Sequence, residues 1–505
     1  MVTVQELLDQ GVLIDPELVK QGIPQEKLDA AVRQYGDDLL VIDQQLLDSL
    51  ATQAQQTRAQ EARTSNGGDG GRVDVVWSYE EPPKKRTYDD FVKALQIRYR
   101  AIERMLKQRQ ELTTTTSIAR IQSKKDREHV SFIGMVTEKN ETANHNYIFT
   151  MEDLSGQIKV LASQKNKELH ELAKDVQLDE VIGITGMGAK DIVFADTILY
   201  PDIPLTKELK KAPKEEYAIF IGDPHFGSKV FLKEDFERML LWLNGKTGNE
   251  EQKRIASKVK YVIFTGDLVE GVGIYPGQEN DLEVQDIAGQ YEECARWLRK
   301  IPEHMQIIIY TGNHDAGRLS EPQEPLLKEF AQPLYDLPNT TIVSNPGMVN
   351  IAATDTFPGL DCLMYHGGSI IYYADSIPSI RAEGGQKRVD LIMKYLLQRR
   401  HLAPTHNATL TIPTTDKDWL LIDRVPDLFI TGHIHRPSIS TYRNVTCINS
   451  GCWTETTEDQ VKRGLEPQPA KLPILNLKTR QAKVMNFKKE PSKAISRGSD
   501  QENKS

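Results

Sequence analysis

Residues 217–228 read YAIFIGDPHFGS, an apolar run that ends in a glycine and is followed by Asp223 and His225. Apolar runs that end in a cluster of glycine and polar residues return four more times, in KYVIFTGDLVEG (260–271), IIIYTGNHD (307–315), LMYHGG (363–368) and LFITGHIH (428–435). Short runs rich in Ile, Val, Phe and Tyr that end at turn residues indicate buried β-strands. We therefore predict a sheet-based domain over residues 215–487, with polar side chains gathered where its strands end.

The side chains that follow these runs are of the kinds that bind metal ions. They are Asp223, His225, Asp267, Asn313, His366, His433 and His435. A strand holds the backbone while the next loop turns a side chain into a crevice at the edge of the sheet. Carboxylate, amide and imidazole together suit two divalent ions, with Mn as the first candidate and Fe, Zn or Mg as alternatives. A single piece is more often structural, but five in order predict a metal centre.

Length and composition limit the class of protein. A chain of 505 residues is too long for one hydrophobic core, and 39% hydrophobic with 27% charged residues is ordinary for a globular protein. No apolar run approaches the roughly 18 residues that span a bilayer, so we predict a cytoplasmic protein with no membrane contact. The scattered cysteines, without a CxxC pair, indicate small buried hydrophobes and not a disulfide framework.

The N-terminal region divides by composition. Helical spacing of apolar residues predicts a small helical module over residues 1–55, which either binds another protein or is dispensable for chemistry. The tract QAQQTRAQEARTSNGGDGGR (53–72) has almost nothing to bury, so we predict a flexible linker over residues 56–80. The charged residues 488–505 are predicted to be a disordered tail.

A basic segment precedes the middle of the chain. Residues 81–127 carry an amphipathic helical stripe from Tyr88 to about Gln110, and thirteen Lys or Arg against five Asp or Glu lie between Lys84 and Arg127. The net charge of the whole chain is −9, so this excess is local. A solvated helix face and a DNA contact explain it equally well.

Residues 128–205 change to the period of strands. Five short strands with a helix between the third and the fourth are the order of an OB-fold barrel, although any small five-stranded barrel, used for protein docking or for nucleic acid, fits the pattern. Phe132, Tyr147 and Phe149 lie in apolar alternation, so we predict core residues in preference to base-stacking aromatics. The predicted fold class is thus multidomain α+β: a helical module, an OB-fold and an α/β domain.

The set DxH, GD, GNH, H and GHxH resembles the signature of calcineurin-like metallophosphoesterases, whose fold is a β-sandwich with flanking helices. The order of domains, with GVGIYPGQ (271–278), QRRHLAPT (398–405), VPDLFITGHIHRP (425–437) and INSGCW (448–453), is similar to the small subunits of archaeal family D DNA polymerases. The resemblance covers residues 80–485 well. These small subunits are related to the B subunits of eukaryotic replicative polymerases, in which the metal ligands are degraded.

The resemblance implies a proofreading 3′-to-5′ exonuclease that acts on single-stranded or frayed 3′ ends of DNA and releases nucleoside 5′-monophosphates. It also implies a large polymerising subunit as partner, and contact with the sliding clamp through the holoenzyme. Carried over by motif position, the ligands of one ion are Asp223, His225 and His435, those of the other are Asn313, His366 and His433, and Asp267 bridges the two ions.

Two further residues have implied catalytic roles. In the family pattern His314 is the general acid that protonates the departing sugar oxygen, a role that suits a side chain with an ordinary pKa near neutrality. Glu270, three residues after Asp267, is the candidate for orienting His314, and a solvated loop carboxylate is its equal alternative. Two rival readings of the whole chain are a scaffold subunit with a silent metal site and a phosphatase for small phosphomonoesters.

Overall fold

The structure is a computed structural model that describes residues 71–123, 127–457, 460 and 465–489, together with the backbone of two short strands. These strands, β1 (Leu13–Ile14) and β2 (Val41–Ile42), pair in parallel. The chain divides into two compact units, residues 1–69 and 70–505. The predicted helices of the N-terminal module, most of the predicted linker and the tail from residue 490 lie outside the described residues.

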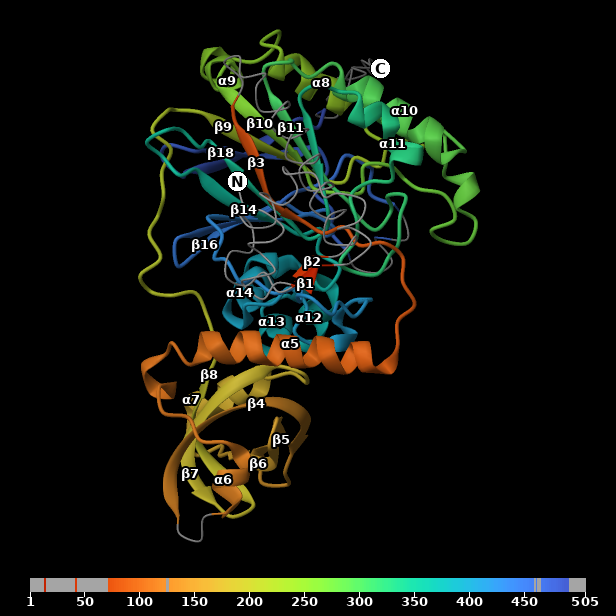
Figure 1. Ribbon diagram of the computed structural model, residues 1–505. Helices are drawn as coiled ribbons and strands as arrows, with labels where there is room; N and C mark the ends of the chain where they lie inside the picture. Colours follow the sequence, from red (N-terminus) through yellow and green to blue (C-terminus); the bar gives the residue numbers. More distant parts are fainter. Residues whose placement is uncertain are drawn as a thin grey trace, which may run out of the picture. The chain divides into compact units, whose positions relative to one another are not determined.

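Two six-stranded sheets form the larger part of the second unit (Figure 1). In spatial order the first contains β12 (Thr340–Val343), β11 (Gln306–Tyr310), β10 (Val259–Phe264), β9 (Tyr217–Ile221), β18 (Lys471–Asn476) and β19 (Ala482–Asn486). The second contains β16 (Ser438–Tyr442), β17 (Val445–Asn449), β15 (Leu428–Thr431), β14 (Leu360–Met364), β13 (Gly347–Ile351) and β3 (Val73–Ser78). Strands β9 to β12 run parallel, as do β14, β15 and β17, so their carboxyl ends share an edge of each sheet.

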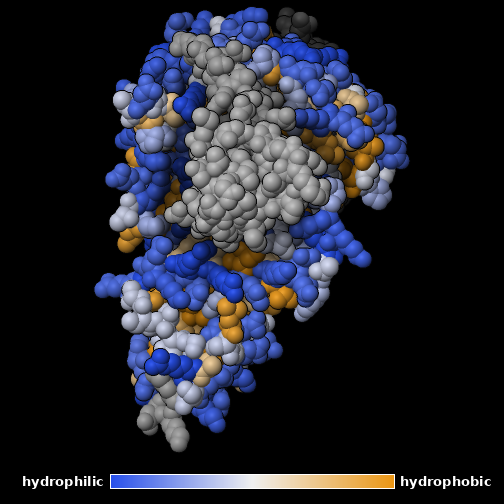
Figure 2. Space-filling model, in the orientation of Figure 1, coloured by the Kyte–Doolittle hydropathy of each residue, from blue (hydrophilic) through white to orange (hydrophobic). Residues whose placement is uncertain are grey.

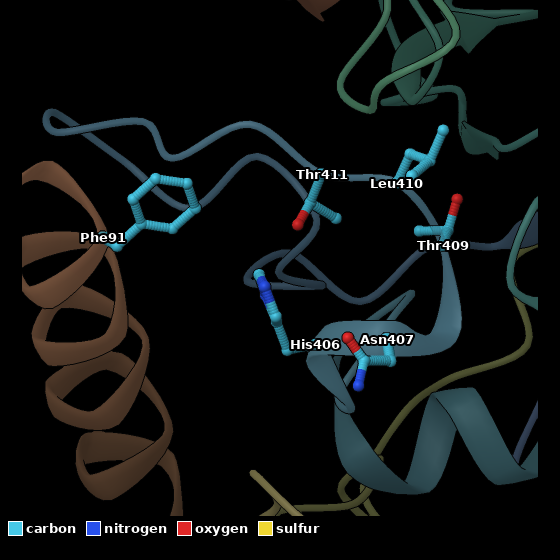
Figure 3. Close-up of a pocket in the computed structure, with 6 residues that line it drawn as sticks. All are labelled: Phe91, His406, Asn407, Thr409, Leu410 and Thr411. Atoms are coloured by element: carbon cyan, nitrogen blue, oxygen red, sulfur yellow. The ribbon is translucent and has the colours of Figure 1, made fainter. Parts of the chain in front are cut away.

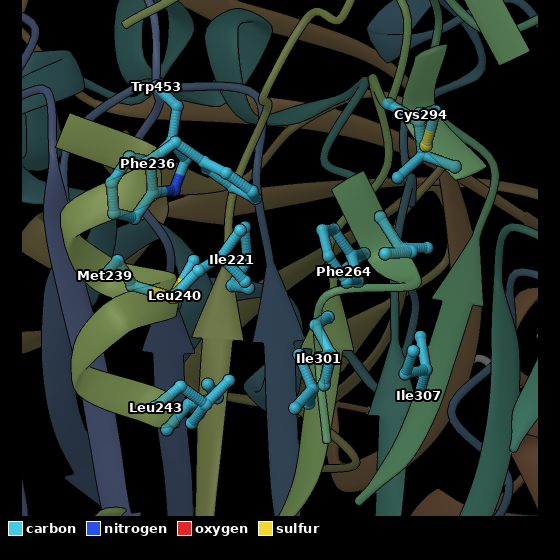
Figure 4. Close-up of a cluster of buried hydrophobic side chains, with 14 of the residues drawn as sticks. Ile221, Phe236, Met239, Leu240, Leu243, Phe264, Cys294, Ile301, Ile307 and Trp453 are labelled. Carbon is cyan, nitrogen blue, oxygen red and sulfur yellow. The ribbon is translucent and has the colours of Figure 1, made fainter. Parts of the chain in front are cut away.

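Apolar side chains hold this domain together in layers. Between the two sheets, residues such as Phe220 and Ile308 of the first pack with Cys362 and Ile430 of the second. The outer face of the first sheet is covered by α8 (Lys233–Leu243), α9 (Glu250–Ala256), α10 (Ile287–Leu298) and α11 (Lys328–Tyr335), and Figure 4 shows part of that core. Covering the second sheet are α12 (Ile370–Ser376), α13 (Pro378–Ala382) and α14 (Val389–Arg399). The order helix, sheet, sheet, helix is a sandwich with flanking helices, as predicted.

Strand β3 corrects the predicted linker over residues 56–80. The segment VDVVWS pairs antiparallel with β13, with Val75 opposite Val349 and Trp77 opposite Met348. Its composition is apolar enough for a strand, but six residues beside a long polar tract give a weak local signal. The partner strand lies about 270 residues further along the chain, so pairing is decided by the folded sandwich and not by the neighbouring sequence.

The middle of the chain is a closed five-stranded barrel, in the order β4, β5, β6, β8, β7. Its elements are β4 (Glu128–Glu141), β5 (Tyr147–Asp153), β6 (Gly156–Ala162), α7 (Lys167–Asp175), β7 (Val181–Ala189) and β8 (Ile192–Leu199). The helix lies between the third and fourth strands, as predicted. Phe132 and Phe149 are fully buried in the barrel core, and Tyr147 is partly buried against it, so the predicted core assignment is confirmed for the two phenylalanines.

Helix α5 (Tyr88–Leu106) corresponds to the predicted amphipathic helix and joins the barrel to the sandwich domain. Tyr99, Ile102 and Leu106 are buried against barrel residues. Arg98, counted among the basic residues, is buried and donates to Asp418, which also accepts from His401 Nε2 at 2.9 Å. This residue therefore serves packing and not a solvated or DNA-binding face. After α5 come η2 (Gln110–Leu112) and α6 (Ile118–Ser123).

A second buried polar cluster ties the barrel to the sandwich. Glu180, immediately before β7, accepts from Arg399 of α14 at 3.0 Å and from the Tyr395 hydroxyl. The guanidinium also lies 3.6 Å from the Tyr395 ring centroid and 3.9 Å from that of Tyr200. Because this charged pair is removed from water, each partner depends on the other, and the contact fixes α14 against the barrel.

The described face in Figure 2 is mostly hydrophilic, and its apolar side chains form small separate patches. Among the helices that the structure describes, none combines the length and the apolar character that crossing a bilayer requires.

Candidate metal centre

The seven predicted ligands follow the carboxyl ends of five buried strands. Residues 223 and 225 follow β9, residue 267 follows β10, residue 313 follows β11, residue 366 follows β14, and residues 433 and 435 follow β15. All five strands are almost entirely buried. The sandwich brings these ends to one place, so side chains up to 212 positions apart in sequence, from Asp223 to His435, converge.

Five of the predicted ligands have left-handed backbone conformations. Asp223, His225, Asp267, His433 and His435 have φ of 37°, 49°, 46°, 69° and 54°. Such values are uncommon outside glycine and cost on the order of 1–3 kcal/mol each. The buried strands before these residues hold the strained turns in place, and the turns direct the side chains inward.

The first group of predicted ligands consists of Asp223, His225 and His435, whose potential ligand atoms all lie within 4.8 Å of one another. His435 Nε2 lies 3.3 Å from Asp223 Oδ2, and His225 Nε2 faces His435 Nε2 at 3.4 Å. Asp223 Oδ2 also accepts from the main-chain nitrogen of His433 at 2.8 Å. This group matches the predicted ligand set of one ion.

The second group consists of Asp267, His366 and His433, again with ligand atoms within 4.8 Å. His366 Nε2 lies 3.2 Å from Asp267 Oδ2 and 2.9 Å from Asn313 Oδ1. Asp267 Oδ2 is also 3.9 Å from His225 Nε2 of the first group. This carboxylate therefore faces both groups, which is where a bridging ligand has to lie.

The donor atoms fit a pair of cations. Two imidazole nitrogens that face each other at 3.4 Å can share at most one proton, so a cation between them satisfies both. His366 Nδ1 faces the carbonyl oxygen of Thr265 at 2.8 Å, which places a proton on Nδ1. Although burial opposes it, Asp267 raises the pKa of His366 to about 10 in the free protein, so a metal ion would take the place of the second proton at Nε2. The mixed nitrogen and oxygen set suits Mn, Fe or Zn.

Electrostatics within the centre keep Asp267 ionised. Burial alone raises the pKa of a carboxyl group, but the His366, His314 and His225 imidazoles hold the pKa of Asp267 well below its ordinary value. Burial, together with the charge of His366, lowers the pKa of His433 to about 4. A deprotonated carboxylate and a neutral imidazole are the forms that bind metal ions.

Glu270 lies differently from the prediction. Its main-chain carbonyl, and not its carboxylate, faces His314 Nδ1 at 2.8 Å, while its carboxylate oxygen Oε2 lies 3.2 Å from His225 Nδ1. Although burial opposes it, contact with His225 lowers the pKa of Glu270 to about 2. The alternative of a solvated loop carboxylate is wrong, since Glu270 is 7% exposed. The sequence could not distinguish these arrangements, because both leave Glu270 three positions after Asp267.

Comparison with known proteins supports one family. A family model for the B subunits of DNA polymerases alpha and epsilon matches residues 218–440. The chain is 36% identical over 388 residues to the DNA polymerase II small subunit of Methanothermobacter thermautotrophicus, a match that covers 77% of each chain. It is 38% identical over 386 residues to that of Archaeoglobus fulgidus, covering 76% of this chain and 75% of the relative. The chain belongs to the archaeal DNA polymerase II small-subunit family.

Not every relative of the family is matched over its whole length. The small subunit of Methanocaldococcus jannaschii is 38% identical over 393 residues, which are 77% of this chain and 64% of that relative. The matched part thus spans less than two thirds of that protein. A solved structure described as a novel archaeal phosphodiesterase is 14% identical, with a TM-score of 0.26, and covers 53% of this chain and 98% of its own. A TM-score this low does not establish a shared fold.

The structure of this family member adds residues that the motifs did not indicate. Asp315 accepts from the main-chain nitrogens of Leu268 at 3.1 Å and Gly312 at 2.8 Å, and so joins the loops after β10 and β11. Buried Glu321 accepts from Tyr365, the neighbour of His366, at 3.0 Å. Asp315 directly follows the GNH motif, so the sequence hinted at its place in the site. No motif lies next to Glu321.

This family member also has a pocket that is separate from the ligand groups. Its volume is about 480 Å³, and Figure 3 shows its lining residues, Phe91, His406, Asn407, Thr409, Leu410 and Thr411. The Phe91 and His406 rings meet edge to face, with centroids 6.2 Å apart. The pocket offers no cluster of metal-binding side chains, so the metal centre is the stronger candidate for chemistry.

Proposed function

We propose that this chain is the exonuclease subunit of an archaeal replicative DNA polymerase and hydrolyses phosphodiesters from the 3′ end of DNA. The observation that carries the proposal is the position of Asp267, a buried carboxylate that faces both groups of predicted ligands. When bound, two divalent ions would supply the positive charge that activates water and offsets the charge of the phosphate. Manganese is the first candidate.

His314 is placed to handle the proton of the leaving group. Its main-chain nitrogen donates to Asp267 Oδ1 at 2.8 Å, and its ring lies 4.7 Å from that of His225. Nδ1 faces the Glu270 carbonyl, which can only accept, so Nδ1 carries a proton and Nε2 is left for substrate. Burial lowers the pKa of His314 in the free protein, and a negatively charged substrate would favour its protonated form. We assign it as the general acid.

The remaining parts support work on DNA beside a second subunit. The five-stranded barrel with a helix between strands three and four is consistent with an OB-fold. Polymerisation would come from a large catalytic subunit, because the family is that of polymerase small subunits. Single-stranded or frayed 3′ ends are the proposed substrate, and contact with a sliding clamp would be made through the holoenzyme.

The test is digestion of a 5′-labelled single-stranded oligonucleotide with Mn²⁺, with and without the large subunit. The native protein should give a ladder that shortens from the 3′ end. The variant His314→Ala should be slower by about 10²- to 10⁴-fold, with Mn²⁺ binding retained by calorimetry. His406→Ala, which removes a histidine outside both ligand groups, is the matched control and should act as the native protein does.

Two results would contradict the proposal. Absence of a ladder under all conditions, with the large subunit present, would leave a scaffold subunit. Rapid hydrolysis of small phosphomonoesters by a protein that leaves the DNA uncut would instead identify a phosphatase.

A further inference from the structure

An exposed apolar loop borders the metal centre. Residues 271–278, GVGIYPGQ, directly follow Glu270 and are called here the 271–278 loop. Val272, Ile274 and Tyr275 are 51%, 37% and 39% exposed. Three large apolar side chains within four positions of a solvent-facing loop form a candidate binding surface.

Buried glutamines hold the backbone of this loop. The side chain of Gln290, which is fully buried, accepts from the Gly271 nitrogen at 2.9 Å and donates to the Gly271 carbonyl at 3.1 Å. Gln278, 1% exposed, accepts from the Ile274 nitrogen at 2.9 Å and donates to the Glu270 carbonyl at 3.0 Å. The loop is therefore preorganised, which lowers the entropy cost of binding a ligand.

Glu270, which precedes the 271–278 loop, contacts both this loop and the candidate metal centre. The Glu270 carbonyl that accepts from Gln278 also faces His314 Nδ1 at 2.8 Å. The Tyr275 hydroxyl lies 3.3 Å from Glu270 Oε1, and the other oxygen of that carboxylate faces His225. One residue thus links the apolar surface to a metal ligand and to the proposed general acid.

Contacts at Gly271 place the apolar side chains beside His314. A β-carbon built on Gly271 would lie 2.5 Å from the His314 carbonyl oxygen and 2.9 Å from Ile274 Cγ1. Ile274 and the backbone of His314 therefore flank the same glycine. The 271–278 loop therefore lies against the backbone of the proposed general acid.

We propose that the 271–278 loop binds the unpaired nucleobase of the nucleotide whose 3′-oxygen is the leaving group. This inference rests on the proposed exonuclease function, in which His314 Nε2 donates a proton to that oxygen. The base of the same nucleotide lies within one nucleotide length of its 3′-oxygen. Val272 and Ile274 supply apolar contact, and the Tyr275 ring supplies a surface for stacking.

The chemistry around Tyr275 favours a base over a phosphate. Its hydroxyl lies 3.0 Å from Asp281 Oδ2 and 3.3 Å from Glu270 Oε1, so two carboxylates lie at the polar end of the ring. Burial and these carboxylates raise the pKa of Tyr275, which stays neutral at physiological pH. The negative charge repels a phosphate group, whereas a neutral aromatic base gains apolar contact. A base can reach the loop only when unpaired, so the loop selects single-stranded or frayed ends.

The experiment measures release of the terminal nucleotide from two oligonucleotides with Mn²⁺. One has a normal base at the second position from the 3′ end, and the other has an abasic nucleotide there. The native protein should prefer the normal oligonucleotide by about 5- to 150-fold in kcat/KM, the range of stacking on one aromatic side chain. Tyr275→Ala should bring this preference close to one, and Tyr275→Phe, which keeps the ring, should retain it.

Two controls separate a base contact from other effects. Leu205→Ala removes an apolar side chain that is 84% exposed outside the loop and should keep the native preference. An abasic nucleotide at the fifth position from the 3′ end should affect the native protein and Tyr275→Ala equally.

Each remaining outcome decides against the inference in a distinguishable way. If the native protein cleaves DNA without preference, or Tyr275→Ala keeps the preference, the loop has another occupant, such as a protein segment, while the exonuclease proposal stands. If the native protein hydrolyses neither DNA nor the base-free diester bis(4-nitrophenyl) phosphate, the proposed function fails, and the base-binding inference fails with it.

Discussion

A single methyl group at Gly312 should disable the metal centre. A β-carbon there would lie 2.3 Å from both the main-chain nitrogen and Oδ1 of Asp267, whereas ordinary contact begins at 3.4 Å. Asp267 must therefore move by about 1.1 Å, the difference between these distances. Its backbone has a φ of 46° and its Oδ1 accepts from His314, so it cannot shift alone. The backbone of Gly312 is not left-handed, and the effect of alanine is purely steric.

The expected magnitude follows from this displacement. Overpacking of this kind costs about 1–3 kcal/mol of folding free energy. A shift of about 1 Å in a catalytic group lowers the rate about 10²-fold, and disturbed ligand support weakens metal affinity about 10- to 100-fold. For Gly312→Ala, Mn²⁺ affinity is measured by titration calorimetry and stability by thermal unfolding.

The matched control is Gly317→Ala on the same loop. A β-carbon at Gly317 meets nothing within 4 Å, but its φ of 159° is one that alanine rarely adopts, so this variant adds backbone strain without a steric clash. This variant should bind Mn²⁺ as the native protein does. Native affinity and native stability in Gly312→Ala would refute the packing argument and the central position of Asp267.

Three further predictions concern stability. Glu180→Ala leaves buried Arg399 without its carboxylate and should lower the free energy of unfolding by about 3–5 kcal/mol in urea titrations. A loss under about 1 kcal/mol would mean that the Tyr200 and Tyr395 rings stabilise the buried guanidinium without the carboxylate. Burial, then the charge of Arg98, lowers the pKa of His401 in the folded protein. As the pH falls below about 6.5, the unfolded chain therefore binds a proton at His401 that the folded protein does not. The free energy of unfolding of the native protein should fall more steeply towards pH 5 than that of His401→Gln. Chelation of metal should lower the unfolding temperature. Mn²⁺ at about 100 times its Kd should raise the free energy of unfolding by about 2.7 kcal/mol. An unfolding temperature that does not change with either treatment would exclude tight binding.

The candidate ligands were readable because their signal is local. Each follows an apolar run within a window of about ten residues, and the period of a strand is visible in such a window. The barrel strands and α5 were predictable for the same reason. Strand β3 was not, since six residues after a polar tract resemble the end of a linker until β13 pairs with them. The buried role of Arg98 was equally invisible, because Asp418 lies 320 positions away.

The sequence by itself indicated which side chains are candidate metal ligands and where the strands before them and the strands of the barrel lie. The tertiary structure alone decided that Asp267 faces both ligand groups, that the Glu270 carboxylate contacts His225 and not His314, and that Gln278 and Gln290 fix an apolar loop beside them. The physical reason is the separation in sequence over which each kind of interaction acts. Side-chain period and turn chemistry act over a few residues, whereas distances between ligands are set by the packing of two sheets whose strands are joined by long connections.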